Sequence, residues 1–395
     1  MLAPLRDYLR SGDPKSSLLL RTTKDCYFTR MSVNVDPEQP GFKDAQWIAS
    51  EDVNVEHLFD VFTSVDPDSN NIWDACISFM RHLYWYKPRQ VVLRPKIEAL
   101  PDNHRSKPEC LLNLAMLFGL VGNPTESIRL LNHALKLERE RWNDDRVALT
   151  LWTLSGASQM LGLRKEGIRQ AKEALEFYER LGETVQRARC LDQLARLLYD
   201  DGQLDAAEEA AVHSIKLLPE EGQEYKVCQS HRTLGNIYGT KGQREKAIHH
   251  YEVALGIASA FNWRIPLFWT HFSLAHLFLA EDEPEDAGAH AERAKFHALD
   301  NLYYLGRVAH LQARILFHQR RLEDAASEVY RALEIFEKLG ALQNLETCRV
   351  LLQTIERAAR SGVPSAYQVP EVSFWEKVLC SAPLNPLFSV CGASS

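Results

Sequence analysis

The chain has 395 residues, of which 45% are hydrophobic and 25% charged, and its formal net charge is −7. This composition is typical of a folded globular protein and excludes a disordered one. The negative charge argues against nucleic-acid binding by the whole molecule. No apolar run reaches the roughly 18–20 residues that a membrane span requires, and the N-terminus lacks the apolar core of a secretory signal.

Eight cysteines are scattered along the chain, and no two of them form a Cys-x-x-Cys pair. Such spacing favours buried, reduced thiols over a disulfide framework. Together with the missing secretory signal, it predicts a cytoplasmic protein that does not interact with membranes.

Residues 1–108 contain several short segments with helical apolar spacing, such as "NVEHLFDVFTSV" and "NNIWDACISFMRHLYWY". A Pro- and Asp-rich connection, "DPEQPGFKDAQWIASED", lies between helical segments. We expect degenerate helical hairpins here, at the N-terminal end of the structure that follows.

Residues 109–360 contain six similar segments and one final helix. Three columns of small residues stay in phase with steps of 40, 40, 40, 40 and 38 residues. The first column is Ala115, Ser155, Ala195, Gly235, Ala275 and Ala313. The second is Ser127, Gly167, Ala207, Ala247, Ala287 and Ala325, and the third is Ala134, Ala174, Ser214, Ala254, Ala294 and Ala332. Small residues at a fixed period mark places where helix backbones approach closely.

Each segment has two runs of apolar residues at helical spacing, separated by a turn. The turn position holds Gly122, Gly162, Gly202 and Gly242, then Asp282 and Arg320. Each segment is therefore predicted to be a helical hairpin. One hairpin cannot bury its apolar face alone, so the six are expected to stack into an all-α, right-handed superhelical solenoid of antiparallel hairpins.

The small and aromatic columns resemble the tetratricopeptide repeat. The 40-residue period is longer than the usual form and is similar to the repeats of kinesin light chains. The segments "MLAPLRDYL", "SEDVNVEHLFDVFTS" and "HLYWYKPR" resemble the C-terminal repeat arm of fungal signal-transduction NTPases, and the resemblance extends over nearly the whole chain. In those proteins a nucleotide-binding module precedes the repeats. The chain has no GxxxxGK[ST] phosphate loop, so the resemblance implies a nucleotide-binding module only in a longer relative or partner chain. Residues 361–395 are rich in Pro and small residues, and we expect a disordered tail.

The segment "KAIHHYEVALG" draws attention because His249 and His250 stand side by side. Adjacent residues on a helix point about 100° apart, so they cannot chelate one ion as residues at i and i+4 can. We expect both to be exposed on the outer face. No other histidine spacing and no nucleophile motif supports a metal or catalytic site, so the sequence predicts no cofactor and no enzyme.

The first helix of each hairpin is expected to line the concave surface of the solenoid. The predicted groove residues are Arg189, Arg196, Tyr199, Gln229, Arg232, Asn236, Trp269, Phe272, His276, Arg307, His310, Arg314 and Phe317. Five of them are arginines, and they oppose only Asp192 and Asp200. Asp192 lies four residues before Arg196 and can pair with it locally.

Arg232 and Asn236 lie one helical turn apart. They resemble the carboxylate-clamp positions of chaperone-binding tetratricopeptide domains, although the lysine-rich first repeat of that clamp is missing. Three hypotheses follow. The first is a scaffold whose groove binds a protein or an acidic or extended peptide. The second is a sensor or autoinhibitory arm of a signalling NTPase. An enzyme is the least favoured.

Overall fold

The computed structural model describes residues 56, 59–60, 63–64, 66–86, 91–219, 222–298 and 301–361. This part of the chain is all-α and contains no strand, which confirms the predicted fold class. Two compact units divide the chain, one comprising residues 1–117 with 387–395 and the other residues 118–386. The predicted tail, from residue 362 onward, lies outside the described residues, as do residues 1–55.

The first unit contains α4 (Asn70–Tyr86), α5 (Arg94–Ala99) and the start of α6 (Lys107–Leu120). Trp73 of α4 is fully buried, and its indole nitrogen donates to the carbonyl of Pro67 at 2.7 Å. Arg81 forms an ion pair with Glu109 of α6 at 2.5 Å. These contacts connect the start of α4 to the preceding turn and α4 to α6.

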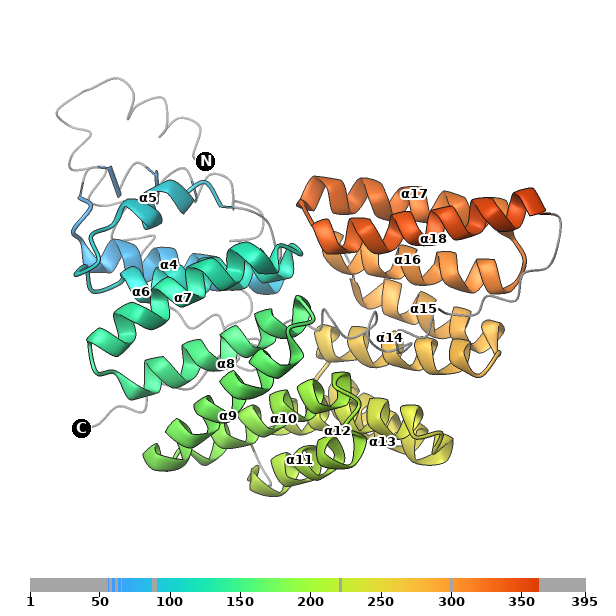
Figure 1. Cartoon of the computed structure of the whole chain (residues 1–395), viewed down its shortest axis with the longest axis horizontal. Coiled ribbons are helices and arrows are strands. Elements are labelled where there is room, and N and C mark those ends of the chain that lie inside the picture. Colours follow the sequence, from blue (N-terminus) through green and yellow to red (C-terminus); the bar gives the residue numbers. More distant parts are fainter. Residues whose placement is uncertain are drawn as a thin grey trace. The chain divides into compact units, whose positions relative to one another are not determined.

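The second unit is a series of antiparallel hairpins that follow one another in chain order (Figure 1). The helices are α7 (Pro124–Glu140), α8 (Asp144–Met160), α9 (Arg164–Leu181), α10 (Thr184–Asp200), α11 (Leu204–Leu217), α12 (Glu224–Thr240), α13 (Arg244–Ala260), α14 (Arg264–Ala280), α15 (Pro284–Ala298), α16 (Leu302–His318), α17 (Leu322–Leu339) and α18 (Leu342–Ser361). From α8 to α17, each even-numbered helix packs most extensively on the helix that follows it. The even-numbered helices from α8 to α18 also contact one another across neighbouring hairpins. They therefore form one layer, called here the inner helices. The odd-numbered helices α9 to α17, which pair with them in the hairpins, are called the outer helices.

The turn inside each hairpin is built in the same way six times. Its central residue has a positive φ, at Gly122, Gly162, Gly202 and Gly242 and then at Asp282 and Arg320. The next residue donates its N–H to the carbonyl five residues earlier, for example Gln243 to Tyr238 at 2.9 Å. This is the left-handed helix ending that favours glycine. Asp282 and Arg320 adopt it with φ of 62° and 63°, so the backbone requirement persists where the glycine is replaced.

All three predicted columns of small residues are buried in the structure. Gly235 of α12 shows why their size matters, because a methyl group built there would lie 2.5 Å from a ring carbon of Tyr251. Tyr251 belongs to α13, is fully buried, and donates its hydroxyl to Asn236 at 2.6 Å. The ring cannot move aside without losing that hydrogen bond.

No described helix is long and apolar enough to cross a bilayer. The described cysteines are all buried and form no disulfide, as the sequence predicts. They are Cys76, Cys110, Cys190, Cys228 and Cys348. Burial raises the pKa of Cys190 and of Cys228 to about 12, so these thiols stay protonated and unreactive at neutral pH.

Gly235→Ala should destabilise the chain by about 1–3 kcal/mol, because the added methyl overpacks the contact with Tyr251. Gly256→Ala is the matched control. Gly256 lies in α13 of the same hairpin, and a methyl group there meets nothing within 4 Å. Removing a glycine from an exposed helix interior should stabilise the chain by about 0.5–1 kcal/mol. Urea unfolding of both variants measures the difference, and equal stabilities would contradict the close approach at Gly235.

Candidate functional site

All thirteen predicted groove residues lie on four inner helices, α10, α12, α14 and α16. None of them is exposed in the structure. Gln229, His310, Arg314 and Arg189 are half-buried and the other nine are buried. The predicted groove is therefore lined by packed, mutually contacting side chains and not by a freely solvated helix face.

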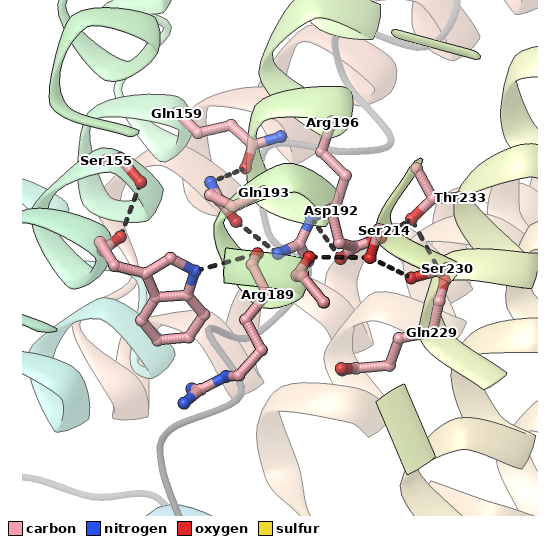
Figure 2. Close-up of polar contacts among 12 residues, drawn as sticks. Ser155, Gln159, Arg189, Asp192, Gln193, Arg196, Ser214, Gln229, Ser230 and Thr233 are labelled. Carbon is pink, nitrogen blue, oxygen red and sulfur yellow. Dashed lines mark hydrogen bonds and ion pairs between the residues drawn. The ribbon is translucent and has the colours of Figure 1, made fainter. Parts of the chain in front are cut away.

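A chain of polar contacts joins three inner helices at one end of this lining (Figure 2). Gln193 of α10 donates its amide to Gln159 of α8 at 3.0 Å, and its carbonyl oxygen accepts from Arg196. The amide of Gln159 donates in turn to Asp200. All four side chains are buried, so each contact satisfies a group that has little access to water.

Asp192 connects this chain of contacts to α12. Its carboxylate accepts a hydrogen bond from the hydroxyl of Thr233 at 2.9 Å and lies 3.5 Å from Nε of Arg196. The local pairing of Asp192 with Arg196 that the sequence predicts is therefore present. Arg196 is neutralised within its own helix, which removes it from the set of open cations.

Arg189 has a different environment. Its guanidinium lies over the ring of Trp152 at 4.4 Å and donates to Gln186 at 2.6 Å. In Figure 2 the side chain extends away from the contacts between Gln193 and Arg196. Trp152 also donates its indole N–H to the backbone carbonyl of Arg189 at 3.4 Å, so this arginine helps to attach α8 to α10.

Arg232 is the exception among these arginines. It is 5% exposed, and among the described residues its guanidinium has no hydrogen-bond or ion-pair partner. Burial lowers its pKa, the neighbouring Arg196 lowers it further, and Asp192 opposes both effects. Because a guanidinium stays protonated in proteins, Arg232 is a buried positive charge without a paired anion.

Asn236 lies one turn after Arg232 on α12. Its carbonyl oxygen accepts from Tyr251, while no hydrogen bond uses its amide nitrogen within the described part of the chain. A guanidinium and an amide donor thus lie side by side. Such a pair can bind a carboxylate and a peptide carbonyl.

Aromatic side chains occupy the neighbouring part of the lining on α14. Trp269 and Phe272 are both buried, and their ring centroids lie 5.7 Å apart. The guanidinium of Arg307 from α16 lies over both rings, at 5.6 Å and 5.1 Å from their centroids. The cation–π contacts stabilise this arginine over the aromatic rings.

His276 of α14 contacts a third arginine. Its Nδ1 lies 3.2 Å from a guanidinium nitrogen of Arg314. Arginine can only donate, so Nδ1 accepts and the ring proton is on Nε2. Burial, followed by Arg314 and Arg307, holds the pKa of His276 well below its usual range. The imidazole is therefore neutral at physiological pH.

The remaining predicted residues are less informative. Tyr199 bonds to the hydroxyl of Thr240 at 2.7 Å, which connects α10 to α12. Phe317 is buried near the end of α16, while Gln229 and His310 are half-buried. The sequence did not identify Gln159, Gln193 and Thr233, which hold the inner helices together at this site. Gln193 lies three residues before Arg196 and Thr233 directly follows Arg232, so closeness to a predicted lining residue was the available signal for these two.

The histidines of "KAIHHYEVALG" differ in environment. His249 is exposed as predicted, but the prediction for His250 was wrong. His250 is half-buried, stacks on Tyr238 with centroids 5.2 Å apart, and contacts His231 of α12. Among the described residues no group of three or more His, Cys, Asp or Glu side chains is arranged to hold a metal.

Comparison with known proteins supports this architecture. Residues 187–217 and 232–261 each match a tetratricopeptide repeat family. These segments are the hairpin α10–α11 and most of α12–α13. The array is of tetratricopeptide type.

The structure of a Rap protein complexed with Competence and Sporulation Factor superposes on this tetratricopeptide-type array with a TM-score of 0.54. The two sequences are 14% identical, and the match covers 87% of this chain and 100% of the Rap chain. A putative kinesin light chain repeat protein from Podospora anserina is 18% identical, with a TM-score of 0.38. The match covers 49% of this chain and 96% of the Podospora chain. A Rap conjugation gene regulator of plasmid pLS20, in complex with the Phr* peptide, is 14% identical, with a TM-score of 0.48. The match covers 87% of this chain and 96% of the regulator. No curated protein matches the sequence.

Asp192→Ala should destabilise the tetratricopeptide-type array by about 3–5 kcal/mol, because it leaves Arg196 buried without its carboxylate and Thr233 without its acceptor. Asp205→Ala is a suitable control. Asp205 is fully exposed and pairs with Lys241, so its loss should leave the melting temperature nearly unchanged. Calorimetry on both variants checks the prediction, and an equally small effect at Asp192 would refute the proposed role of the pair.

Arg232→Met should leave the melting temperature unchanged or raise it. The substitution removes a buried charge that no described side chain compensates, and an apolar side chain of similar length fills the same space. Thermal unfolding followed by circular dichroism measures the effect. A large loss of stability would show that Arg232 has a structural partner and is not an open binding group.

Proposed function

We propose that the chain is a protein-interaction scaffold that binds a partner peptide along its inner helices. The proposal assigns it a binding role and no catalytic one. The observation that carries the proposal is the buried guanidinium of Arg232, which has no partner in the described structure. A buried charge is costly unless it is paired, so a residue of this kind is accounted for by an anion that arrives with a ligand.

The chemistry around Arg232 defines the ligand class. A carboxylate can accept two parallel hydrogen bonds from a guanidinium, and the free amide of Asn236 can donate to a backbone carbonyl one residue away. Trp269 and Phe272, one repeat further on, offer apolar contact for a neighbouring side chain. We therefore propose an extended peptide with an acidic residue or a C-terminal carboxylate at Arg232 and an apolar residue toward α14.

Similar structures give limited support to this proposal. The Rap protein with the same fold was solved in complex with Competence and Sporulation Factor, so an array of this kind can bind a partner. At 14% identity the likeness extends to the fold alone. The identity of the ligand of the present chain has to come from its own residues.

The alternative hypothesis is a sensor or autoinhibitory arm that contacts the nucleotide-binding module of a signalling NTPase. It would use the same inner surface for a folded domain in place of a peptide. The narrow set of donors at Arg232 and Asn236 favours a peptide, because two adjacent donors can satisfy one extended strand but cover little of a domain surface. A cytoplasmic setting remains a prediction that rests on the reduced cysteines.

A random linear peptide library displayed on phage tests the proposal. The wild-type chain should enrich sequences that contain Asp, Glu or a free C-terminus near an apolar residue. A synthetic peptide of the enriched sequence should bind Arg232→Met at least about 30-fold more weakly, the effect expected when a buried charged partner is removed. Fluorescence anisotropy provides the measurement.

Arg169→Met is the matched control. Arg169 lies on the outer helix α9, is largely exposed, and pairs with Glu166 of the same helix. Its loss should leave peptide affinity unchanged. Enrichment of peptides that bind wild-type and Arg232→Met chains equally would exclude Arg232 as the recognition group.

A further inference from the structure

Two histidine pairs occur in the same register of consecutive hairpins. His231 of α12 faces His250 of α13, and their Nδ1 atoms lie 2.9 Å apart. His271 of α14 faces His290 of α15 with an Nδ1–Nδ1 distance of 3.1 Å. Both members of the second pair lie 40 residues after their counterparts in the first, so the repeat itself places the two pairs.

An aromatic ring supports each pair at an equivalent position. The ring of His250 is parallel to that of Tyr238, with centroids 5.2 Å apart and planes 9° apart. His290 stacks on Phe278 in the same way, at 5.3 Å and 18°. Stacking fixes the plane of each outer-helix imidazole and leaves its Nδ1 edge toward the inner helix.

The distances suit two ligands of one metal ion. Imidazole nitrogen binds transition metals at about 2.0–2.1 Å. Two such bonds at a right angle place the nitrogens about 2.9 Å apart, whereas a tetrahedral angle places them about 3.3 Å apart. The observed 2.9 Å matches the right-angled geometry that Ni²⁺ and Cu²⁺ favour, and the observed 3.1 Å lies between the right-angled and the tetrahedral values.

We propose that each histidine pair binds one divalent transition-metal ion of the nickel and copper type through its two Nδ1 atoms. Both rings then have their proton on Nε2, and a ring that was protonated at Nδ1 changes tautomer without net loss of a proton. Since no third protein ligand is present within the described chain, water completes the coordination. The ion joins the inner to the outer helix of its hairpin, and its inner-helix ligands directly precede Arg232 and Phe272 in the chain.

Charged groups of both signs lie near the outer-helix histidines. Glu208 and Lys246 act on His250 with opposite signs. Asp286 and Arg293 do the same at His290. On the inner helices, His271 has the basic Arg293 and the imidazole of His297 as neighbours besides its partner.

The sequence analysis missed these sites for a definite reason. It considered pairs of histidines within one helix, where His249 and His250 diverge. The ligating pairs are separated by 19 residues and come from both helices of a hairpin. Their contact depends on how the two helices are aligned.

Isothermal titration of the untagged full chain with NiCl₂ at pH 7.5 tests the proposal. His250→Phe and His290→Phe keep a ring for stacking and remove the ligand. Each should bind one Ni²⁺ fewer than the wild type, and the double variant two fewer. His249→Phe, which alters the exposed neighbour on the same helix, should bind as many ions as the wild type.

A second set of variants, His231→Asn and His271→Asn, removes the inner-helix ligands and should give the same stoichiometries. Ni²⁺ should also raise the melting temperature of the wild type but not that of the double variant, because binding to the folded state alone stabilises it. If the wild type takes up no Ni²⁺, or the double variants bind as many ions as the wild type, the pairs are hydrogen-bonded imidazoles only and the proposal is overturned.

Discussion

The close approach of helix backbones at the small residues is the constraint on which the rest of the structure depends. At Gly235 there is no room for even a methyl group beside Tyr251. Small residues recur at the equivalent positions about every 40 residues, so each inner helix can approach its partner in the hairpin closely. The inner helices consequently contact one another across hairpins, and side chains from α8, α10 and α12 meet in one polar chain.

That polar chain determines which charged groups are available to a ligand. Gln193 accepts from Arg196 and donates to Gln159, Asp192 pairs with Arg196, and Arg189 lies on Trp152. These contacts hold the inner helices in register but leave few free donors. Arg232 and the amide of Asn236 remain on α12, and the aromatic residues around Trp269 lie on α14, the next inner helix. The arrangement resembles a binding site more than a stabilising core, because an unpaired buried charge contributes nothing favourable to folding.

Much of the architecture could be predicted from the sequence, because it depends on local and periodic features. The small columns and the turn positions are visible in the letters, including Asp282 and Arg320, which adopt the positive φ of the glycines they replace. The pairing of Asp192 with Arg196 follows from helical spacing. The predicted groove residues lie on the inner helices as expected, because the repeat period identifies the first helix of each hairpin.

Contacts between helices could not be predicted in this way. Whether Gln159 reaches Gln193, or His231 reaches His250, depends on crossing angles and axial offset, which no single-helix pattern contains. The burial of the lining was missed for a related reason. Side chains from adjacent inner helices cover one another, so residues placed on an open face by periodicity alone, such as Asn236, are in fact buried.

The central claim is that Arg232 is the recognition group of a peptide site on the inner helices. A crystal structure of the chain with a bound, library-selected peptide tests it most directly. The account predicts a ligand carboxylate within about 2.7–2.9 Å of the Arg232 guanidinium, with the peptide running toward Trp269. A peptide bound on the outer helices or at the hairpin turns, with Arg232 still without an anion, would contradict it.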